Sequence, residues 1–132
     1  MTIWEGLVLE ELVRIFKSVS DPTRLRILRM LAIKPLCVCE VMSVLGMAQS
    51  TTSRHLGILA AAGLIEALPG GTWTVYRLPS AAKGAAGRVL ALIGEAPVDS
   101  KFKMDAAAAG RADRNRLCCV RAEKTIKRQR RG

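Results

Sequence analysis

A helix with a polar beginning, placed directly after a tight turn, constrains the fold of this chain more than any other feature. From residue 49 to 62, apolar residues recur at helical spacing behind a polar first half. The polar half reads Gln49-Ser50-Thr51-Thr52-Ser53-Arg54-His55. A shorter helix is expected from about Cys37 to Leu45, and Gly46 supplies the left-handed residue that commonly ends a helix. Two helices joined by so short a turn predict a helix-turn-helix.

The segments around this pair complete the expected fold. Residues 64–68 and 73–78 flank Pro69-Gly70-Gly71-Thr72, which predicts a β-hairpin. Further helices are expected over residues 3–17, after the N-cap Asp21 and Pro22, from Ser80 to Ile93, and beyond Asp99. This order predicts an α+β fold, mainly α: a winged helix-turn-helix with a two-stranded wing and helical dimerisation extensions.

With 132 residues, the chain has material for one small domain with extensions. We expect a winged helix-turn-helix dimerisation and DNA-binding domain over residues 1–98. A C-terminal helix and a basic, cysteine-containing tail follow over residues 99–132. The apolar faces of the first helix and of the 80–93 helix need a partner, so we expect them to pair with their symmetry mates in a homodimer.

The charge of the chain favours a polyanionic partner. Its formal net charge is +10, and nine basic residues stand against two acidic ones between residues 111 and 131. An aromatic content of 4% argues against a single-strand binder, which leaves double-stranded DNA. The longest apolar run, residues 56–65, has about half of the roughly 20 residues that a spanning helix needs, so no membrane partner is expected. Acidic residues near the N-terminus argue against a secretory signal and favour a cytoplasmic protein.

Four cysteines, Cys37, Cys39, Cys118 and Cys119, are expected to be thiols in that compartment, which favours metal binding or redox sensing over structural disulfides. In the middle of a helix, Cys37 and Cys39 would point about 200° apart. At a helix start, however, the first residue can leave helical geometry and approach the second. The positive end of the helix dipole also favours thiolates there.

Three motifs carry a family resemblance. Residues 20–28 read SDPTRLRIL, residues 36–40 read LCVCE and residues 53–56 read SRHL. In this order they resemble the ArsR/SmtB family of metal-sensing repressors, over residues 16–78, and the second is similar to the arsenic-sensing box LCVCD. Two departures matter: Ala48 stands where the family commonly has a serine N-cap, and Met42 stands where some arsenite sensors have a third cysteine.

The leading face of the 49–62 helix is the expected DNA-reading surface. Glutamine can read adenine and arginine guanine by paired hydrogen bonds in the major groove. The expected contacts to operator DNA are Gln49, Ser50, Thr51, Ser53, Arg54, His55 and, from the wing, Arg77. For His55, the resemblance implies either a structural or a DNA-side role. The alternative for this face is a solvated helix surface.

The resemblance implies a trivalent metalloid, As(III) or Sb(III), as the inducer that releases DNA, with no organic cofactor. Three thiolates would hold it: Cys37, Cys39 and either Cys118 or Cys119, from the same or the partner subunit. Alternatives are cysteines that serve as small apolar residues, a tetrathiolate zinc site and a thiol redox switch. The 80–93 segment contains no histidine, which argues against the zinc and nickel sites of similar repressors.

Two other classes of protein were weighed against a repressor. An enzyme is not expected, because no phosphate-cradling loop or general-base histidine accompanies a cysteine and no cofactor fingerprint is present. An architectural DNA-binding module with incidental cysteines would bind DNA without responding to a ligand.

Overall fold

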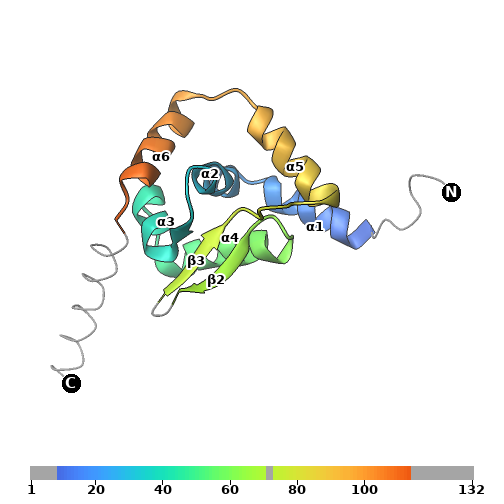
Figure 1. The fold of residues 1–132 in the computed structure, drawn as a ribbon, viewed down its shortest axis with the longest axis horizontal. Helices are drawn as coiled ribbons and strands as arrows, with labels where there is room; N and C mark the ends of the chain where they lie inside the picture. Colours follow the sequence, from blue (N-terminus) through green and yellow to red (C-terminus); the bar gives the residue numbers. More distant parts are fainter. Residues whose placement is uncertain (1–8, 71–72, 114–132) are drawn as a thin grey trace, which may run out of the picture.

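The computed structural model describes residues 9–70 and 73–113. Its helices and strands are α1 (Leu9–Val19), α2 (Pro22–Leu31), β1 (Leu36–Cys37), α3 (Val38–Leu45), α4 (Gln49–Ala61), β2 (Glu66–Gly70), β3 (Trp73–Arg77), α5 (Gly84–Glu95) and α6 (Ser100–Arg111). Figure 1 shows α2 near the centre, α1 and α5 toward one end, α3 and α6 toward the other, and the β2–β3 hairpin along one side. The predicted winged helix-turn-helix is confirmed.

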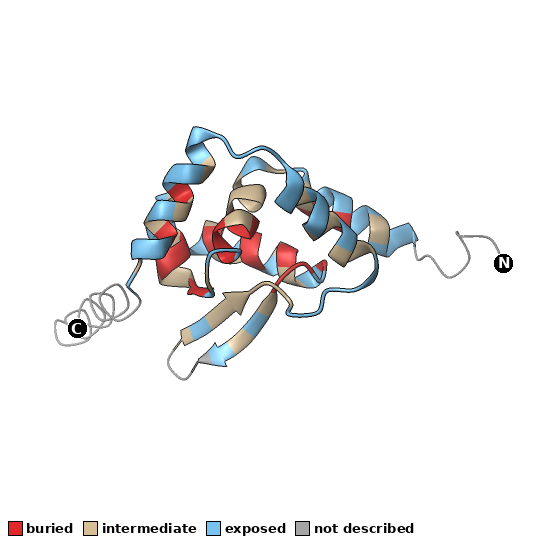
Figure 2. Ribbon diagram, turned by 45° about the horizontal axis from the view of Figure 1, so that its top comes forward, coloured by how far each residue is buried: buried red, intermediate tan, exposed pale blue. Residues whose placement is uncertain are grey.

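One hydrophobic core joins α2 to the helix-turn-helix and to the base of the hairpin. The fully buried apolar side chains include Ile27, Met30, Leu36, Val41, Leu56, Leu59 and Leu64. Figure 2 shows this buried centre, with the hairpin extending from it into solvent. Burial of each such side chain contributes about 1.5–3 kcal/mol, so α4 is held mainly by its second half, which carries Leu56 and Leu59.

The first two helices meet at a well-defined N-cap. Asp21 Oδ2 accepts a hydrogen bond of 2.9 Å from the Arg24 N–H, and Pro22 is the first residue of α2, as predicted. In α1, Ile15 and Ser18 are the buried residues, whereas Leu9, Val13 and Phe16 are exposed. The apolar stripe that we expected on this helix therefore faces away from the core of its own protomer.

The sheet has three antiparallel strands in the order β1-β3-β2. The β2–β3 hairpin is the predicted wing, with Glu66 opposite Arg77 at its base and Gly70 opposite Trp73 toward its tip. Strand β1 was not predicted: Leu36 pairs with Tyr76 and Cys37 with Val75. Helix α3 was expected from about Cys37, and Cys37 is its N-cap as well as the last residue of β1. A two-residue strand is too short to show alternation, and its partner is distant in the sequence.

Helix α5 begins at Gly84 rather than at Ser80, so that prediction was also wrong. Gly84 has a φ of 66°, which is a left-handed value. A right-handed helix therefore cannot continue from Gly84 back toward Ser80. The loop before it packs closely on the first turn, since a Cβ at Gly87 would collide with the carbonyl of Ala82. Val89 and Leu90 pack against the core as expected, but Leu92 is 67% exposed.

Helix α6 follows Asp99 as predicted, and Asp99 is its N-cap, with the Phe102 N–H donating to Asp99 Oδ1 at 2.9 Å. It packs on α2 and α3, where Ala109 is fully buried. Arg26 of α2 binds Asp105 with two hydrogen bonds, Nε to Oδ2 at 2.8 Å and Nη2 to Oδ1 at 3.0 Å. These contacts make α6 part of the same core.

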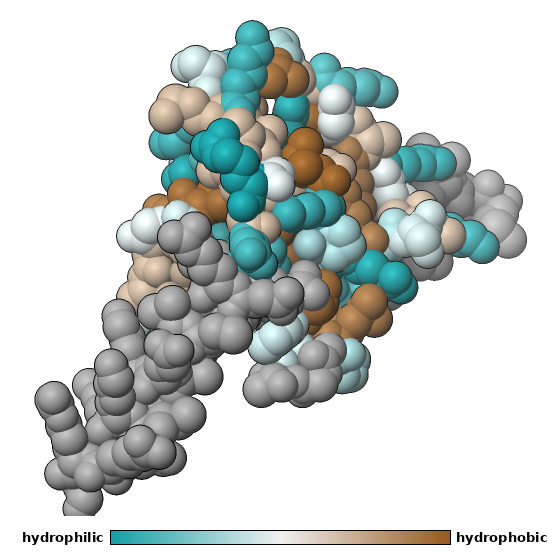
Figure 3. Space-filling model, turned by 60° about the vertical axis from the view of Figure 1, so that its left-hand side comes forward, coloured by the Kyte–Doolittle hydropathy of each residue, from teal (hydrophilic) through white to brown (hydrophobic). Residues whose placement is uncertain are grey.

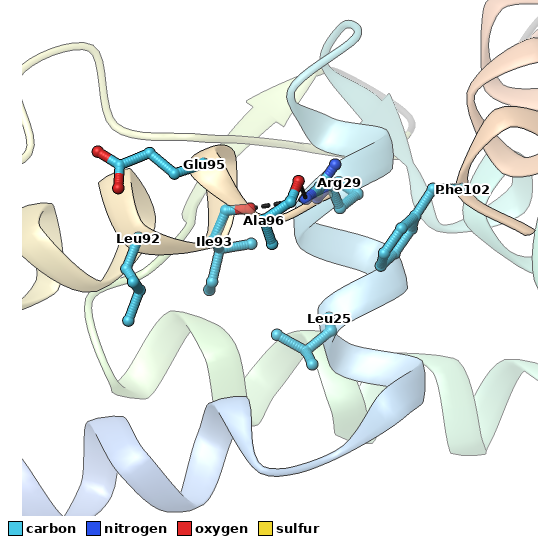
Figure 4. A pocket seen from close by; sticks show the side chains of 7 residues that line it. All are labelled: Leu25, Arg29, Leu92, Ile93, Glu95, Ala96 and Phe102. Carbon is cyan, nitrogen blue, oxygen red and sulfur yellow. Dashed lines mark hydrogen bonds between the residues drawn. The ribbon is translucent and has the colours of Figure 1, made fainter. Parts of the chain in front are cut away.

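Arg29 links the end of α5 to α6. Its Nη2 donates to the carbonyl oxygens of Ile93 at 2.8 Å and Ala96 at 2.7 Å, and its guanidinium lies 4.5 Å from the centre of the Phe102 ring (Figure 4). Carbonyls at a helix end lack partners within the helix, so a guanidinium stabilises them there. Leu25, Leu92 and Phe102 line a pocket of about 460 Å³ beside this contact.

Candidate DNA-binding and thiolate sites

The turn between α3 and α4 presents the start of α4 to solvent. Gly46 ends α3 with a φ of 67°, as its position predicted, and its N–H donates to the Met42 carbonyl at 2.8 Å. Ala48 is the N-cap of α4 and makes no side-chain cap bond. Thr52, which is fully buried, donates from Oγ1 to the Ala48 carbonyl at 2.9 Å. The first turn of α4 is therefore stabilised by a side chain within the helix, Thr52, rather than by the side chain of its N-cap.

The predicted DNA contacts on α4 divide by their exposure. Gln49, Ser50 and Arg54 are exposed, and Thr51 and Ser53 are half-buried. His55 instead is buried, with 7% of its surface exposed, and its Nδ1 lies 3.2 Å from Nη1 of Arg24. Of the two roles that the resemblance implied for this residue, its surroundings favour the structural one.

The wing residue Arg77 has a partner within the wing. Its Nε donates to Glu66 Oε2 at 3.0 Å, and the two residues lie opposite each other at the base of the hairpin. Both side chains are partly exposed. The Arg77 side chain therefore bridges the two strands at the base of the wing.

The two N-terminal cysteines of the predicted thiolate site lie where β1 meets α3. Cys37 is fully buried and has extended backbone angles, φ −87° and ψ 170°, so it leaves helical geometry, as we expected that the first residue at a helix start can. Cys39 is half-buried in the first turn of α3. The Cys37 N–H donates to Glu40 Oε1 at 2.9 Å. We had not predicted this role for Glu40, although a glutamate three residues after an N-cap is a known signal.

The end of α6 lies beside this junction. Lys34 donates from Nζ to the carbonyl oxygens of Gly110 at 3.3 Å and Ala112 at 3.0 Å. Lys34 precedes Cys37 by three residues and lies in the loop that leads into β1. Its bonds to Gly110 and Ala112 therefore place the end of α6 close to this loop. Cys118 and Cys119 lie outside the described residues. Within residues 9–70 and 73–113, no group of three or more His, Cys, Asp or Glu side chains is arranged to hold a metal ion.

The surface around α3 and α6 contains both polar and apolar side chains. On the side that carries α3 and α6, polar side chains alternate with smaller apolar patches (Figure 3).

Among the described helices, none combines the length and the apolar character that crossing a membrane would require.

Comparison with known proteins agrees with this architecture. Residues 21–67 match the family described as bacterial regulatory protein, arsR family. An uncharacterized HTH-type transcriptional regulator of Methanocaldococcus jannaschii is 46% identical over 68 residues, which are 51% of this chain and 76% of that protein. The arsenical resistance operon repressor of Escherichia coli is 39% identical over 67 residues. That match spans 50% of this chain and 57% of the repressor.

A solved structure extends the match to the fold. The homodimeric winged helix-turn-helix DNA-binding domain of a possible ArsR-family transcriptional regulator from Mycobacterium bovis superposes with a TM-score of 0.58 at 30% identity. The superposition covers 71% of this chain and 84% of the other.

The helix-turn-helix, the wing and these matches define a winged helix DNA-binding protein, a transcriptional regulator rather than an enzyme. The chain belongs to the ArsR family. The motifs at residues 20–28, 36–40 and 53–56, which suggested this family, lie within or beside the matched segment.

Proposed function

We propose that this protein is a cytoplasmic, homodimeric repressor that binds operator DNA through α4 and releases it when As(III) or Sb(III) binds its cysteine thiolates. The observation that carries the proposal is the position of Cys37 and Cys39 at the start of α3, the helix that leads into α4. A ligand that rearranges this start acts directly on the helix-turn-helix. The name of the related E. coli repressor supports arsenic as the inducer.

The exposed faces of α1 and α5 support the dimer. Leu9 is 74% exposed and Val13 and Phe16 are also exposed, three residues that share one face of α1. Leu92 of α5 is exposed as well, and α1 and α5 contact each other within the protomer. Apolar side chains gathered on two neighbouring helices are typical of an isologous interface. Such a dimer would present two copies of α4 to successive turns of DNA.

The third sulfur in this proposal comes from Cys118 or Cys119 of the same protomer. The end of α6 is bonded to Lys34, three residues before Cys37. Cys118 is the sixth residue after Ala112, and an extended chain of six residues reaches about 20 Å. The route within one subunit is therefore short. A route to the partner subunit remains an alternative, and so does a disulfide or zinc-binding response of the same four cysteines.

Release then follows as a shift between two states of the helix-turn-helix. Cys37 is fully buried and paired with Val75 of β3, so binding of a metalloid by both N-terminal thiolates must open the junction of β1 and α3. Since α3 packs on α4, this opening changes the position of the DNA-reading helix. Allosteric coupling is commonly about 1–3 kcal/mol, and by reciprocity operator DNA must weaken metalloid binding by the same factor.

A mobility-shift titration with the DNA upstream of the protein's own gene tests this function. We expect arsenite or antimonite, added to the operator complex, to release DNA, and zinc and peroxide to have little effect. Release by zinc or peroxide alone would favour the zinc-responsive or redox alternative. DNA binding that no ligand changes would favour an architectural module.

A pair of double variants then tests the cysteines. Replacing Cys37 and Cys39 by serine should abolish release and leave DNA binding intact. Replacing Cys118 and Cys119 by serine should weaken arsenite binding and release. Unchanged affinity and unchanged release in the second variant would show that Cys37 and Cys39 suffice and that the three-sulfur site is wrong.

A further inference from the structure

One side chain of α2 bonds both to the end of α1 and to the DNA-reading helix. Arg24 donates from Nε to the Ser18 carbonyl at 2.6 Å and from Nη2 to the Lys17 carbonyl at 3.1 Å. Its third nitrogen, Nη1, lies 3.2 Å from Nδ1 of His55 in α4. The three nitrogens of the guanidinium thus hold α1 on one side and α4 on the other.

The local structure fixes both partners of Arg24. The Ser18 and Lys17 carbonyls lie in the last turn of α1, where a cation is favoured, and the Lys17 carbonyl also accepts from the Ser20 N–H at 3.4 Å. Ser18 itself is fully buried, and its hydroxyl donates to the Ile15 carbonyl at 2.7 Å. On the other side, His55 is a buried residue of α4 and follows the exposed Arg54.

This geometry requires one form of the His55 ring. Since Arg24 can only donate, Nδ1 must accept, and the imidazole must be neutral with its proton on Nε2. Burial lowers the pKa of His55, Asp21 raises it, and Arg24 and Arg54 lower it further. The charged groups around the ring are therefore Asp21 and Arg24 of the α2 start and Arg54 of α4, while α1 contributes backbone carbonyls to Arg24.

We propose that Arg24 is a positioning residue for DNA binding: it holds α4 in register with α1 through neutral His55, and protonation of His55 releases this hold and weakens operator binding. A protonated ring has two donors and no acceptor, so it cannot accept from Arg24. In the proposed dimer, α1 lies at the interface, so Arg24 relates each DNA-reading helix to the dimer axis. The inference rests on the proposed contact of α4 with DNA.

The test measures operator affinity by fluorescence anisotropy from about pH 8 to about pH 5.5, a range that includes the ordinary His pKa. His55→Asn is the matched control, since its amide oxygen offers an acceptor that does not titrate. The parent should lose about tenfold in operator affinity on acidification beyond any change in His55→Asn. Arg24→Met should bind the operator about tenfold more weakly at the higher pH, and Arg24→Lys should recover part of this loss.

Two further measurements separate positioning from stability and from the DNA contact. Imidazole ¹⁵N shifts of the parent should show the Nε2–H tautomer at the higher pH and lose it in Arg24→Met, while the circular dichroism spectrum stays unchanged. Arg54→Ala should weaken binding at the higher pH, where His55 is neutral with or without Arg54, which tests the contact of α4 with DNA separately. Equal pH profiles for the parent and His55→Asn, or an Nδ1–H tautomer, would overturn the proposal.

Discussion

Removing the carboxylate of Asp105 should destabilise the protein far more than removing that of Glu66. Both residues form an ion pair with an arginine, Asp105 with Arg26 at 2.8 Å and Glu66 with Arg77 at 3.0 Å. The first pair is mostly buried, with side-chain exposures of 17% for Arg26 and 8% for Asp105, while the second is 41% and 43% exposed. The chain therefore contains a matched comparison of a buried and an exposed pair.

The magnitude follows from burial. Removing one partner of a buried pair costs about 3–5 kcal/mol, because the remaining charge stays desolvated. Arg26 keeps some access to water, so we expect Asp105→Ala to lower the free energy of unfolding by about 3 kcal/mol. Exposed pairs contribute about 0.2–1 kcal/mol, so Glu66→Ala should cost less than about 1 kcal/mol.

Urea denaturation at one fixed protein concentration measures both variants, since dimerisation would make stability concentration-dependent. The double variant Arg26→Met/Asp105→Leu should recover much of the loss, because it leaves no unpaired charge in the core. Equal losses for Asp105→Ala and Glu66→Ala would refute the claim that Arg26 and Asp105 anchor α6.

Three further predictions concern α4. Ala48→Ser should raise the free energy of unfolding by about 1 kcal/mol in the same assay, because the N-cap makes no side-chain bond at present; an unchanged value would show that Thr52 already satisfies this turn. Arg54→Ala should weaken operator binding by about 1–3 kcal/mol and leave arsenite affinity unchanged, and parental operator affinity would mean that this face of α4 does not contact DNA. The lowered pKa of His55 means that the unfolded state binds the proton more readily, so its contribution to stability is present above about pH 6.5 and is lost as the pH falls toward the folded-state pKa. Urea midpoints should therefore fall more on acidification in the parent than in His55→Asn, and parallel curves would contradict this.

Much of the fold was predictable from local signals in the sequence. Asp21-Pro22 and Asp99 start helices, and Gly46 ends one, because each of these residues satisfies or shapes a helix end through its own backbone and side chain. The polar first half of α4 likewise indicated the exposure of Gln49, Ser50 and Arg54, although Thr52 and His55 in the same half are buried. The position of Cys37 at a helix start allowed its extended backbone, and the spacing of the two cysteines excludes a shared helical face.

Only the tertiary structure decided which side chains meet across the molecule. Strand β1 forms because Leu36 and Cys37 pair with Tyr76 and Val75, and the buried His55 contacts Arg24 of another helix. Lys34 binds the end of α6 although it precedes Gly110 by 76 positions in the sequence. Helical and turn signals act within a few neighbouring residues, whereas these contacts depend on how whole elements pack. Distances along the chain therefore do not reveal them, and packing assigns the partners of Cys37, His55 and Arg77.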